Sequence, residues 1–296
     1  SRPVGMRVGI SFVSVAQARK NLSESAGLTF GEVRDRAGQI WRQEMGKVRV
    51  SGGRKEDRRT FATALYHSLL EPSVQSDVNG LYRGQDLKVH RVAPGHAHYS
   101  DISGWDVYRS QIQLLAMIEP RRAADIAASL LRMEKQGGCL PRWPYATQNS
   151  NVMNGDPSSP IIATIHALGV RGFDARDALR AMVKGADHPC HSDNADYTER
   201  EALDDYLDLG WISQERNVTS GQHSVSERSS PWGTASTTME YALADFTVSR
   251  LARALGRDQL AARFLKRSGK WRNLVNPASQ RIEPRFADGS FLPGAN

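Results

Sequence analysis

The sequence predicts a mainly α-helical protein whose helices form a toroid rather than a bundle. Apolar residues recur at intervals of three and four over most of the chain, and glycine or proline separates neighbouring helical stretches. Long loops alternate with short ones between paired helices, which favours a toroid. The 296 residues, of which 40% are hydrophobic, suffice for a substantial core.

Two short stretches in the N-terminal part favour β-structure instead. Residues 6–14 are rich in β-branched side chains and alternate in their first half, which predicts a strand that belongs to a preceding sheet. A second short strand is expected over residues 47–50, followed by a turn at Gly52 and Gly53.

Helical periodicity accounts for most of the remaining chain. Ser14 is expected to cap the first helix, and Pro120, the Gly137-Gly138 pair and Gly256 mark helix boundaries. Residues 71–104 lack this period, and a loop of that length in a compact domain is usually functional or disordered. The aromatic and apolar residues Leu81, Tyr82 and Val89 favour an ordered loop. The expected helices span residues 16–24, 30–45, 54–70, 110–118, 121–135, 160–168, 175–184, 201–209, 234–255 and 258–274.

Composition excludes some classes of protein and leaves one question open. The net charge is +7, but the basic residues are scattered, which argues against a nucleic-acid-binding face. The sequence holds no apolar run of about 18 residues, so no membrane span is expected. The two cysteines, Cys139 and Cys190, form either one disulfide or two free thiols, and the compartment stays open on this evidence.

The segment over residues 99–109 carries the strongest functional signal. A loop rich in Ser, Gly and Asp brings Trp105, Asp106 and Arg109 to the start of an apolar helix. An indole ring offers a flat apolar platform for a sugar face, and charged groups bind vicinal hydroxyls strongly. This pattern indicates a carbohydrate site. The structural alternative is a helix N-terminus with Asp106 near the cap and Trp105 in the core.

Two further clusters of chemical side chains have structural alternatives that we favour. His188, Cys190, His191 and Asp193 have residue types that suit zinc, but their crowding favours a polar loop. An acidic run in the next helix has the spacing of acid and base pairs, but such runs are usually a solvated face. That run comprises Glu199, Glu201, Asp204, Asp205 and Asp208.

Five separate stretches together resemble one family of enzymes. The chain is similar to glycoside hydrolase family 92, the calcium-dependent exo-acting α-mannosidases, from about Arg7 to Leu292. The order and spacing of the motifs also match. These motifs lie at residues 61–72, 76–84, 140–144, 152–156 and 238–242.

This resemblance implies an (α/α)6 toroid that follows an N-terminal β-sandwich. Residues 1–30 then correspond to the end of the sandwich and a linker, and residues 31–296 to the first part of the catalytic domain, truncated at its C-terminus. Nine helices are expected in that part, whereas a complete toroid has twelve. We therefore expect an incomplete toroid with exposed apolar helix faces.

The resemblance also implies which residues bind the substrate. Trp105 and Asp106 match the pair that lines the mannose subsite, and Arg109 follows one turn later. Asn149 and Ser150 stand where many members have Glu-Thr, which puts a ligand role there in doubt. The substrate-binding set implied by the family is Trp105, Asp106, Arg109, Arg142, Trp143 and Asp156. No catalytic residue and no metal ligand is assigned within the chain, because the general acid, a Glu in a Glu-Gly-Asn-like motif, and the base are expected beyond Asn296.

The implied function is the removal of terminal α-linked mannose from oligosaccharides or glycoproteins. The family hydrolyses with inversion, which requires an acid and a base on opposite sides of the sugar, and uses calcium, which binds mannose hydroxyls. Such an enzyme would act outside the cell, in the periplasm or at the cell surface. The alternative is a catalytically silent fragment or a mannoside-binding remnant. Under both hypotheses, this chain alone is expected to be catalytically inactive.

Overall fold

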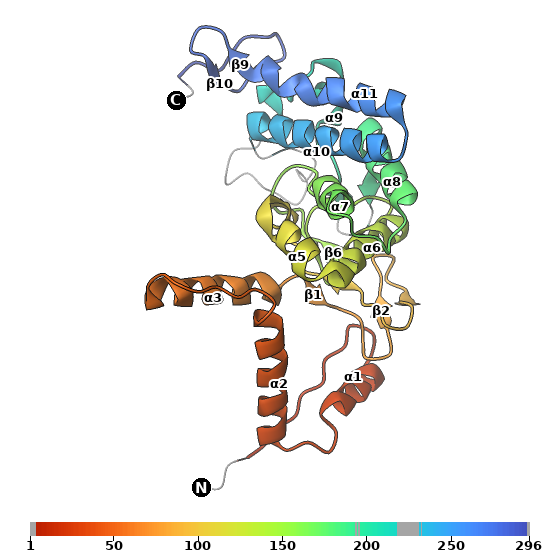
Figure 1. Cartoon of the computed structure of the whole chain (residues 1–296). Coiled ribbons are helices and arrows are strands. Elements are labelled where there is room, and N and C mark those ends of the chain that lie inside the picture. Colours follow the sequence, from red (N-terminus) through yellow and green to blue (C-terminus); the bar gives the residue numbers. More distant parts are fainter. Residues whose placement is uncertain (1–3, 193, 195, 218–230, 232, 295–296) are drawn as a thin grey trace.

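A computed structural model describes residues 4–294 apart from 193, 195, 218–230 and 232. Its N-terminal part contains three helices, α1 (Val15–Asn21), α2 (Phe30–Met45) and α3 (Lys55–Leu70). The remaining helices form a stack beside these three, with α11 at the far end (Figure 1). The stack contains α5 (Ile112–Ile118), α6 (Pro120–Gly137), α7 (Ser158–Ala167), α8 (Ala175–Asp187), α9 (Leu203–Asp208), α10 (Thr234–Ala254) and α11 (Asp258–Arg267).

Local capping explains why several helices begin and end where the sequence predicts. The Thr29 hydroxyl and the Glu32 carboxylate accept hydrogen bonds reciprocally from each other's backbone N–H groups at the start of α2. The Asp174 carboxylate accepts from two backbone N–H groups at the start of α8. Gly138 ends α6 in the left-handed conformation, with φ of 89°.

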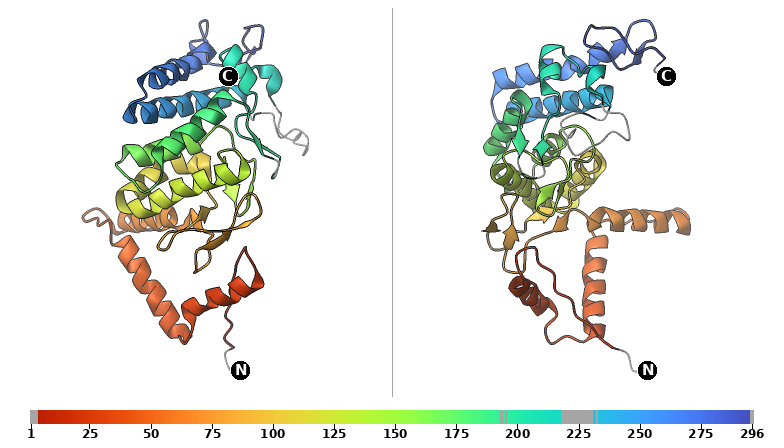
Figure 2. Two further views of the ribbon diagram at one scale, coloured as in Figure 1. Left: turned by 90° about the vertical axis from the view of Figure 1, so that its right-hand side faces the viewer. Right: turned by 180° about the vertical axis from the view of Figure 1, so that it is seen from behind.

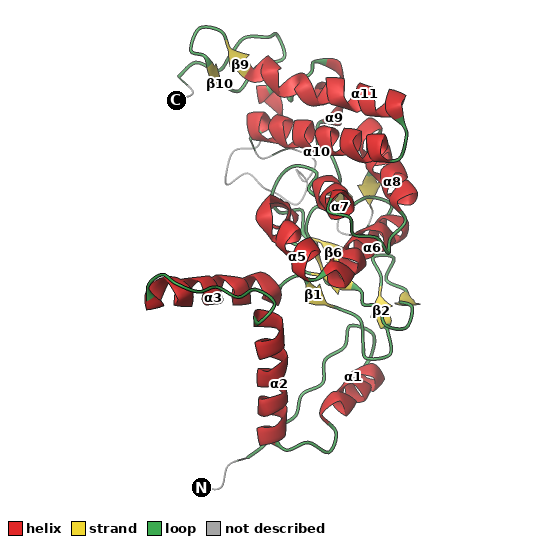
Figure 3. Ribbon diagram, in the orientation of Figure 1, coloured by secondary structure: helices red, strands yellow, loops and turns green. Residues whose placement is uncertain are grey.

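The strands are short and pair only within two-stranded antiparallel ribbons (Figure 3). Two ribbons lie in the long loop before α5 and two lie between the helices of the stack, so they connect helices rather than form a layer. The pairs are β1 (Ser73–Val74) with β4 (Tyr99–Ser100), β2 (Leu81–Arg83) with β3 (Val89–Arg91), β5 (Pro144–Tyr145) with β6 (Gln148–Asn149), β7 (His191–Ser192) with β8 (Tyr197–Thr198), and β9 (Val275–Asn276) with β10 (Arg281–Ile282).

The main core lies between α5, α6, α7, α8 and α10, whose apolar faces meet inside the stack. Burying one such aliphatic side chain stabilises a fold by about 1.5–3 kcal/mol, so this cluster holds the helices in fixed positions. Fully buried members include Ile112, Leu115, Ile126, Leu130, Ile161, Ile165, Met182 and Val248.

The predicted strands at residues 6–14 and 47–50 are wrong. Both segments are irregular or bent in the structure, because no strand among the described residues lies beside them to accept their hydrogen bonds. The last predicted helix, 258–274, divides into α11 and a 3₁₀ segment, Ser268–Leu274. The helix expected over residues 201–209 is confirmed only for Leu203–Asp208.

The described helices form an open stack and not a closed ring (Figure 2). Apolar side chains line a hollow of about 600 Å³ on the outer face of α10 and α11. Met239, Phe246, Leu265 and Trp271 are among them, and each is more than a third exposed. This agrees with the expected exposure of apolar helix faces. No described helix combines the length and apolar character that a membrane crossing requires.

The sequence left open whether the two cysteines form a disulfide or two free thiols. In the structure, Cys139 and Cys190 form a disulfide. The bond joins the end of α6 to the segment after α8, and both residues are buried. Because Cys190 is bonded to Cys139, it is not a thiolate ligand, and the zinc grouping with His188 and His191 is not supported. Asp193, the fourth member of that grouping, lies outside the described residues.

Candidate functional site

Gly104 has no side chain, which allows the segment around Trp105 to pack closely against two other loops. A Cβ atom at this position would lie 2.4 Å from the Arg142 carbonyl oxygen and 2.5 Å from Cγ of Pro157. Only glycine permits so close an approach. The 140–144 and 152–157 segments therefore meet the Trp105 loop at one point, as expected if the separate family motifs form one site.

Trp105 begins a helical turn that passes through a π-helical segment, Val107–Gln111, before α5. Such π-helical turns are rare and occur often at functional sites. The indole is partly buried against the main core. The guanidinium of Arg109 lies 3.8 Å from the ring centroid and covers one face of the indole.

Asp106 is exposed beside this ring, and its carboxylate accepts a hydrogen bond from the Ser103 hydroxyl. The structure therefore has features of both interpretations, the predicted carbohydrate site and the alternative helix N-terminus. Trp105 packs partly on the core, as the alternative expects, whereas Asp106 keeps an oxygen available to solvent. Whether the two side chains line one concave pocket stays a prediction.

Glu240 on α10 completes this group, although it is not among the substrate-binding residues that the resemblance implied. Its carboxylate accepts hydrogen bonds from the Tyr108 hydroxyl at 2.8 Å and from the Arg109 guanidinium at 3.1 Å. Burial and the neighbouring carboxylate raise the pKa of Tyr108, so the hydroxyl remains a donor. Gly155 lies against the Glu240 side chain, because a Cβ there would approach it to 2.7 Å.

Arg142 is 1% exposed and lies inside the protein. Its guanidinium makes an ion pair at 3.1 Å and satisfies several carbonyl groups, so no free donor is directed to the surface. We therefore assign Arg142 a positioning role instead of the direct sugar contact that the resemblance implied. Its acceptors are the backbone oxygens of Met153, Gly155, Thr198 and Glu199 and a carboxylate oxygen of Glu201.

Asp156 is also buried, at 4% exposed, and belongs to an ion network below the site. The Arg200 guanidinium donates to Asp156 at 2.8 Å and to Asp245 at 2.9 Å. Arg267 and the Tyr206 hydroxyl donate to the same Asp245 carboxylate. The hydrogen bonds to Asp156 all go to Oδ2, so the network holds this carboxylate in place, and a sugar contact by Asp156 stays a prediction.

Trp143 is partly exposed at the start of the β5–β6 ribbon. Its backbone N–H donates to the Asn149 side-chain oxygen at 3.1 Å, and its carbonyl accepts from the Ser150 hydroxyl at 3.1 Å. Asn149 and Ser150 therefore shape the ribbon that carries Trp143. Trp143 is the one residue of the 140–144 motif that is not buried, and its contact with a sugar stays a prediction.

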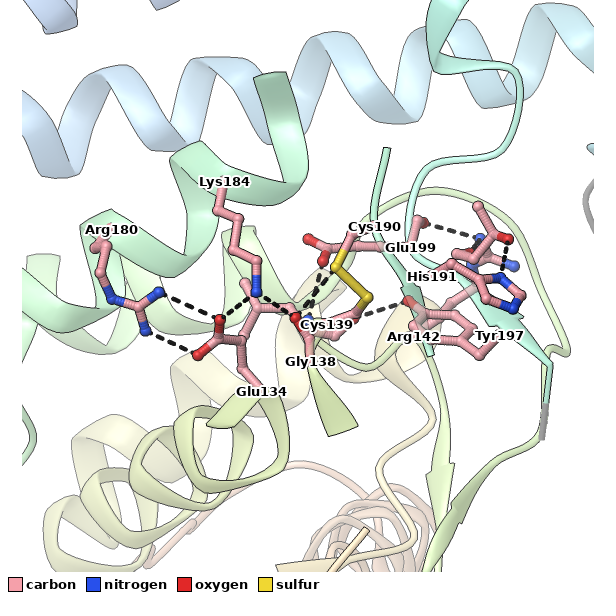
Figure 4. The surroundings of a disulfide bond; sticks show 12 residues. Glu134, Gly138, Cys139, Arg142, Arg180, Lys184, Cys190, His191, Tyr197 and Glu199 are labelled. Atoms are coloured by element: carbon pink, nitrogen blue, oxygen red, sulfur yellow. Dashed lines mark hydrogen bonds and ion pairs between the residues drawn. A yellow bond between two sulfur atoms is a disulfide. The ribbon is translucent and has the colours of Figure 1, made fainter. Parts of the chain in front are cut away.

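The expectation that the acidic run is a solvated face is wrong for its first two members. Glu199 and Glu201 are 2% and 5% exposed, because the chain there passes beneath the 138–142 segment. Glu201 pairs with Arg142, while Glu199 accepts from the Leu140 N–H at 2.9 Å and lies beside the disulfide (Figure 4). Burial raises the pKa of both carboxyl groups, and most strongly that of Glu199.

Replacing Glu199 by glutamine is expected to make the free energy of unfolding less sensitive to rising pH. Burial raises the pKa of Glu199 well above 4.5, so the folded state holds a proton that the unfolded state releases above that pH. The free energy of unfolding contributed by this group is therefore present at low pH and lost as pH rises. Urea titrations at pH 5 and pH 8 should show Glu199→Gln gaining stability relative to the natural chain. The exposed Glu24→Gln variant should show no such gain.

The one cluster of acidic, histidine or cysteine side chains found in the described part of the chain does not suit calcium. Calcium takes six to eight oxygen ligands, whereas the one group of three His, Cys, Asp or Glu side chains found in the described part of the chain is Cys139, Cys190 and Glu199. Two of these are sulfur atoms of a disulfide, which do not suit a hard cation. Calcium therefore stays a prediction for the whole protein.

The model for the glycosyl hydrolase family 92 catalytic domain matches residues 17–296. The chain belongs to this family. A family 92 α-mannosidase of Bacteroides thetaiotaomicron, solved with mannoimidazole, superposes with a TM-score of 0.83 at 28% identity over 97% of this chain and 35% of its own. A second mannosidase of that organism, described as inverting, gives a TM-score of 0.84 at 25% identity over 97% of this chain and 37% of its own.

Among curated proteins, an uncharacterized secreted glycosidase of Arthroderma benhamiae is 24% identical over 292 residues. The match covers 97% of this chain and 32% of the relative, so the chain spans about a third of that relative's length. The matched structures bear out the predicted fold class, a mainly helical part of a family 92 catalytic domain.

Proposed function

We propose that this family 92 chain forms the sugar-binding wall of an exported α-mannosidase. The whole enzyme would remove terminal α-linked mannose from oligosaccharides or glycoproteins, with inversion and with calcium on the sugar hydroxyls. Family membership and the two mannosidase neighbours support this substrate class. The catalytic acid and base would come from segments that correspond to the unmatched part of the relatives.

The observation that carries the proposal is the group formed by Trp105, Asp106 and Arg109 with Glu240. The part of the indole that neither Arg109 nor the core covers presents an apolar surface, and the exposed carboxylate presents acceptors for hydroxyl groups. Glu240 fixes Arg109 over one face of the ring. A sugar needs both kinds of contact, because its ring has apolar C–H faces and polar edges. Trp143 lies on the neighbouring ribbon and would extend the apolar contact.

Binding of methyl α-mannoside to this chain tests the wall directly. We expect weak saturable binding in calorimetry, reduced about tenfold by Trp105→Ala and by Asp106→Asn, a loss of about 1.4 kcal/mol in each case. Trp271→Ala is the matched control, because this indole is 37% exposed in the separate hollow beside α10 and α11. Equal binding by the Trp105 and Trp271 variants would contradict the proposal.

Hydrolysis is tested separately with an activated aryl mannoside and calcium. We expect no measurable turnover from residues 1–296 alone, because the family resemblance places both catalytic carboxylates outside them. Acid and base catalysis each contribute roughly 10² to 10⁴-fold in rate, which binding contacts cannot replace. Turnover that disappears in Asp106→Ala would show that the catalytic carboxylates lie within this chain.

A further inference from the structure

A second hollow lies between α8 and the turn that joins α10 to α11. Its volume is about 930 Å³, within the range of small-molecule sites. None of the residues of the Trp105 site lines it. The lining residues are Arg176, Leu179, Arg180, Val183, Lys184, His188 and the segment 255–260.

Four aliphatic side chains provide the apolar part of this hollow. Leu179 and Val183 come from α8, and Leu255 and Leu260 come from the two sides of the α10–α11 turn. Leu179 is buried and the other three are partly buried, so the apolar surface is recessed below longer polar side chains. A ligand with an apolar face would cover it.

Basic side chains surround this apolar surface. Arg176, Arg180 and Lys184 follow one another four residues apart on α8, which places them on one side of the helix. Figure 4 shows that Arg180 and Lys184 both reach the buried carboxylate of Glu134, at 2.8 and 3.1 Å. These two cations are therefore held in place and partly neutralised by the protein itself.

The other two arginines have no acidic partner among the described residues. Arg176 and Arg257 are exposed at the hollow and form no ion pair there. Asp187, at the end of α8, pairs with Arg263 and Arg267 and does not line the hollow. Asp258 is the one acidic residue that lines the hollow, so the positive charge is not balanced locally.

We propose that this hollow binds an anionic sugar, a saccharide that carries a phosphate or sulfate group. Arg176 and Arg257 would bind the anion, because guanidinium groups match the geometry of phosphate and sulfate oxygens. The aliphatic floor would contact the C–H face of the sugar ring. Glycans are the substrates of this family, so an acidic glycan substituent would meet this surface. The inference does not depend on the mannosidase activity proposed above.

Calorimetric titration with mannose 6-phosphate tests this site, with mannose and inorganic phosphate as comparison probes. We expect saturable binding of mannose 6-phosphate with a Kd on the order of 1 mM, and weaker binding of either comparison probe. The double variant Arg176→Gln/Arg257→Gln should weaken this binding at least tenfold. Arg253→Gln, an exposed arginine at the end of α10 that does not line the hollow, should change it less than twofold.

The same titrations can overturn the inference. Absence of saturable binding, or an equal loss in Arg253→Gln, would mean that the hollow is no more than basic surface. Inorganic phosphate that binds as tightly as mannose 6-phosphate would refute the sugar contact. Loss of binding in Trp105→Ala would place the ligand in the mannoside site instead. Mannoside binding that fails while mannose 6-phosphate binding persists would contradict the proposed function alone.

Discussion

Replacing Arg200 by glutamine is expected to lower the free energy of unfolding by about 3–5 kcal/mol. The guanidinium is fully buried and lies between the carboxylates of Asp156 and Asp245, at 2.8 and 2.9 Å. Glutamine cannot supply the charge or reach both carboxylates, so Asp156 would lose its one ionic partner in a dry interior. Urea denaturation at pH 7 measures the change.

A surface ion pair provides the matched control for Arg200. Arg34 lies 2.8 Å from Asp35, but their side chains are 68% and 64% exposed. Water screens such a pair, so Arg34→Gln should change the free energy of unfolding by less than about 1 kcal/mol. A change below 1 kcal/mol for Arg200→Gln as well would mean that the buried network does not stabilise the fold.

Helices could be predicted well from the sequence because their signals are local. The bounds of α2 were predicted residue for residue, and its capping box lies within four consecutive positions, from Thr29 to Glu32. The glycine that ends α6 and the apolar stripe of α10 are likewise contained in a short window of sequence. Such signals need no knowledge of the tertiary structure.

Strands and buried charges could not be predicted in the same way, because they depend on distant partners. Residues 6–14 have strand composition, but a strand forms only where another strand accepts its hydrogen bonds. Glu199 and Glu201 have the spacing of a solvated run, but Arg142, 59 residues before Glu201, draws the chain inward. No local pattern encodes that pairing.

The residues of the candidate site likewise divide into those with a local sequence signal and one that depends on distant packing. Trp105, Asp106 and Arg109 lie within five residues, so their combination was visible in the sequence. Glu240 lies 131 residues after Arg109, and its place in the site appears only once α10 packs beside the loop. Its occurrence within one of the five family motifs, at residues 238–242, was the available signal.

Replacing Gly104 by alanine is expected to remove methyl α-mannoside binding and to lower the free energy of unfolding by about 1–3 kcal/mol. The new methyl group would lie 2.4 Å from the backbone oxygen of Arg142 and 2.5 Å from the Pro157 ring. Neither neighbour can give way easily, because the Arg142 guanidinium is fixed by buried acceptors and the proline ring is rigid. The Trp105 loop must therefore move.

This displacement would carry the whole binding group with it. Trp105 and Asp106 directly follow Gly104, and Arg109 keeps its place through the Trp105 carbonyl and Glu240. A shift of about 1 Å in such a group can cost a factor of 10² in function, more than the loss of one contact.

Gly31→Ala is the control, because the nearest atom to the added methyl group is 3.9 Å away on the exposed start of α2. It should keep mannoside binding and leave stability unchanged or raise it by up to about 1 kcal/mol. If Gly104→Ala instead folds with unchanged stability and binds methyl α-mannoside as the natural chain does, the close contact with Arg142 and Pro157 does not position the site.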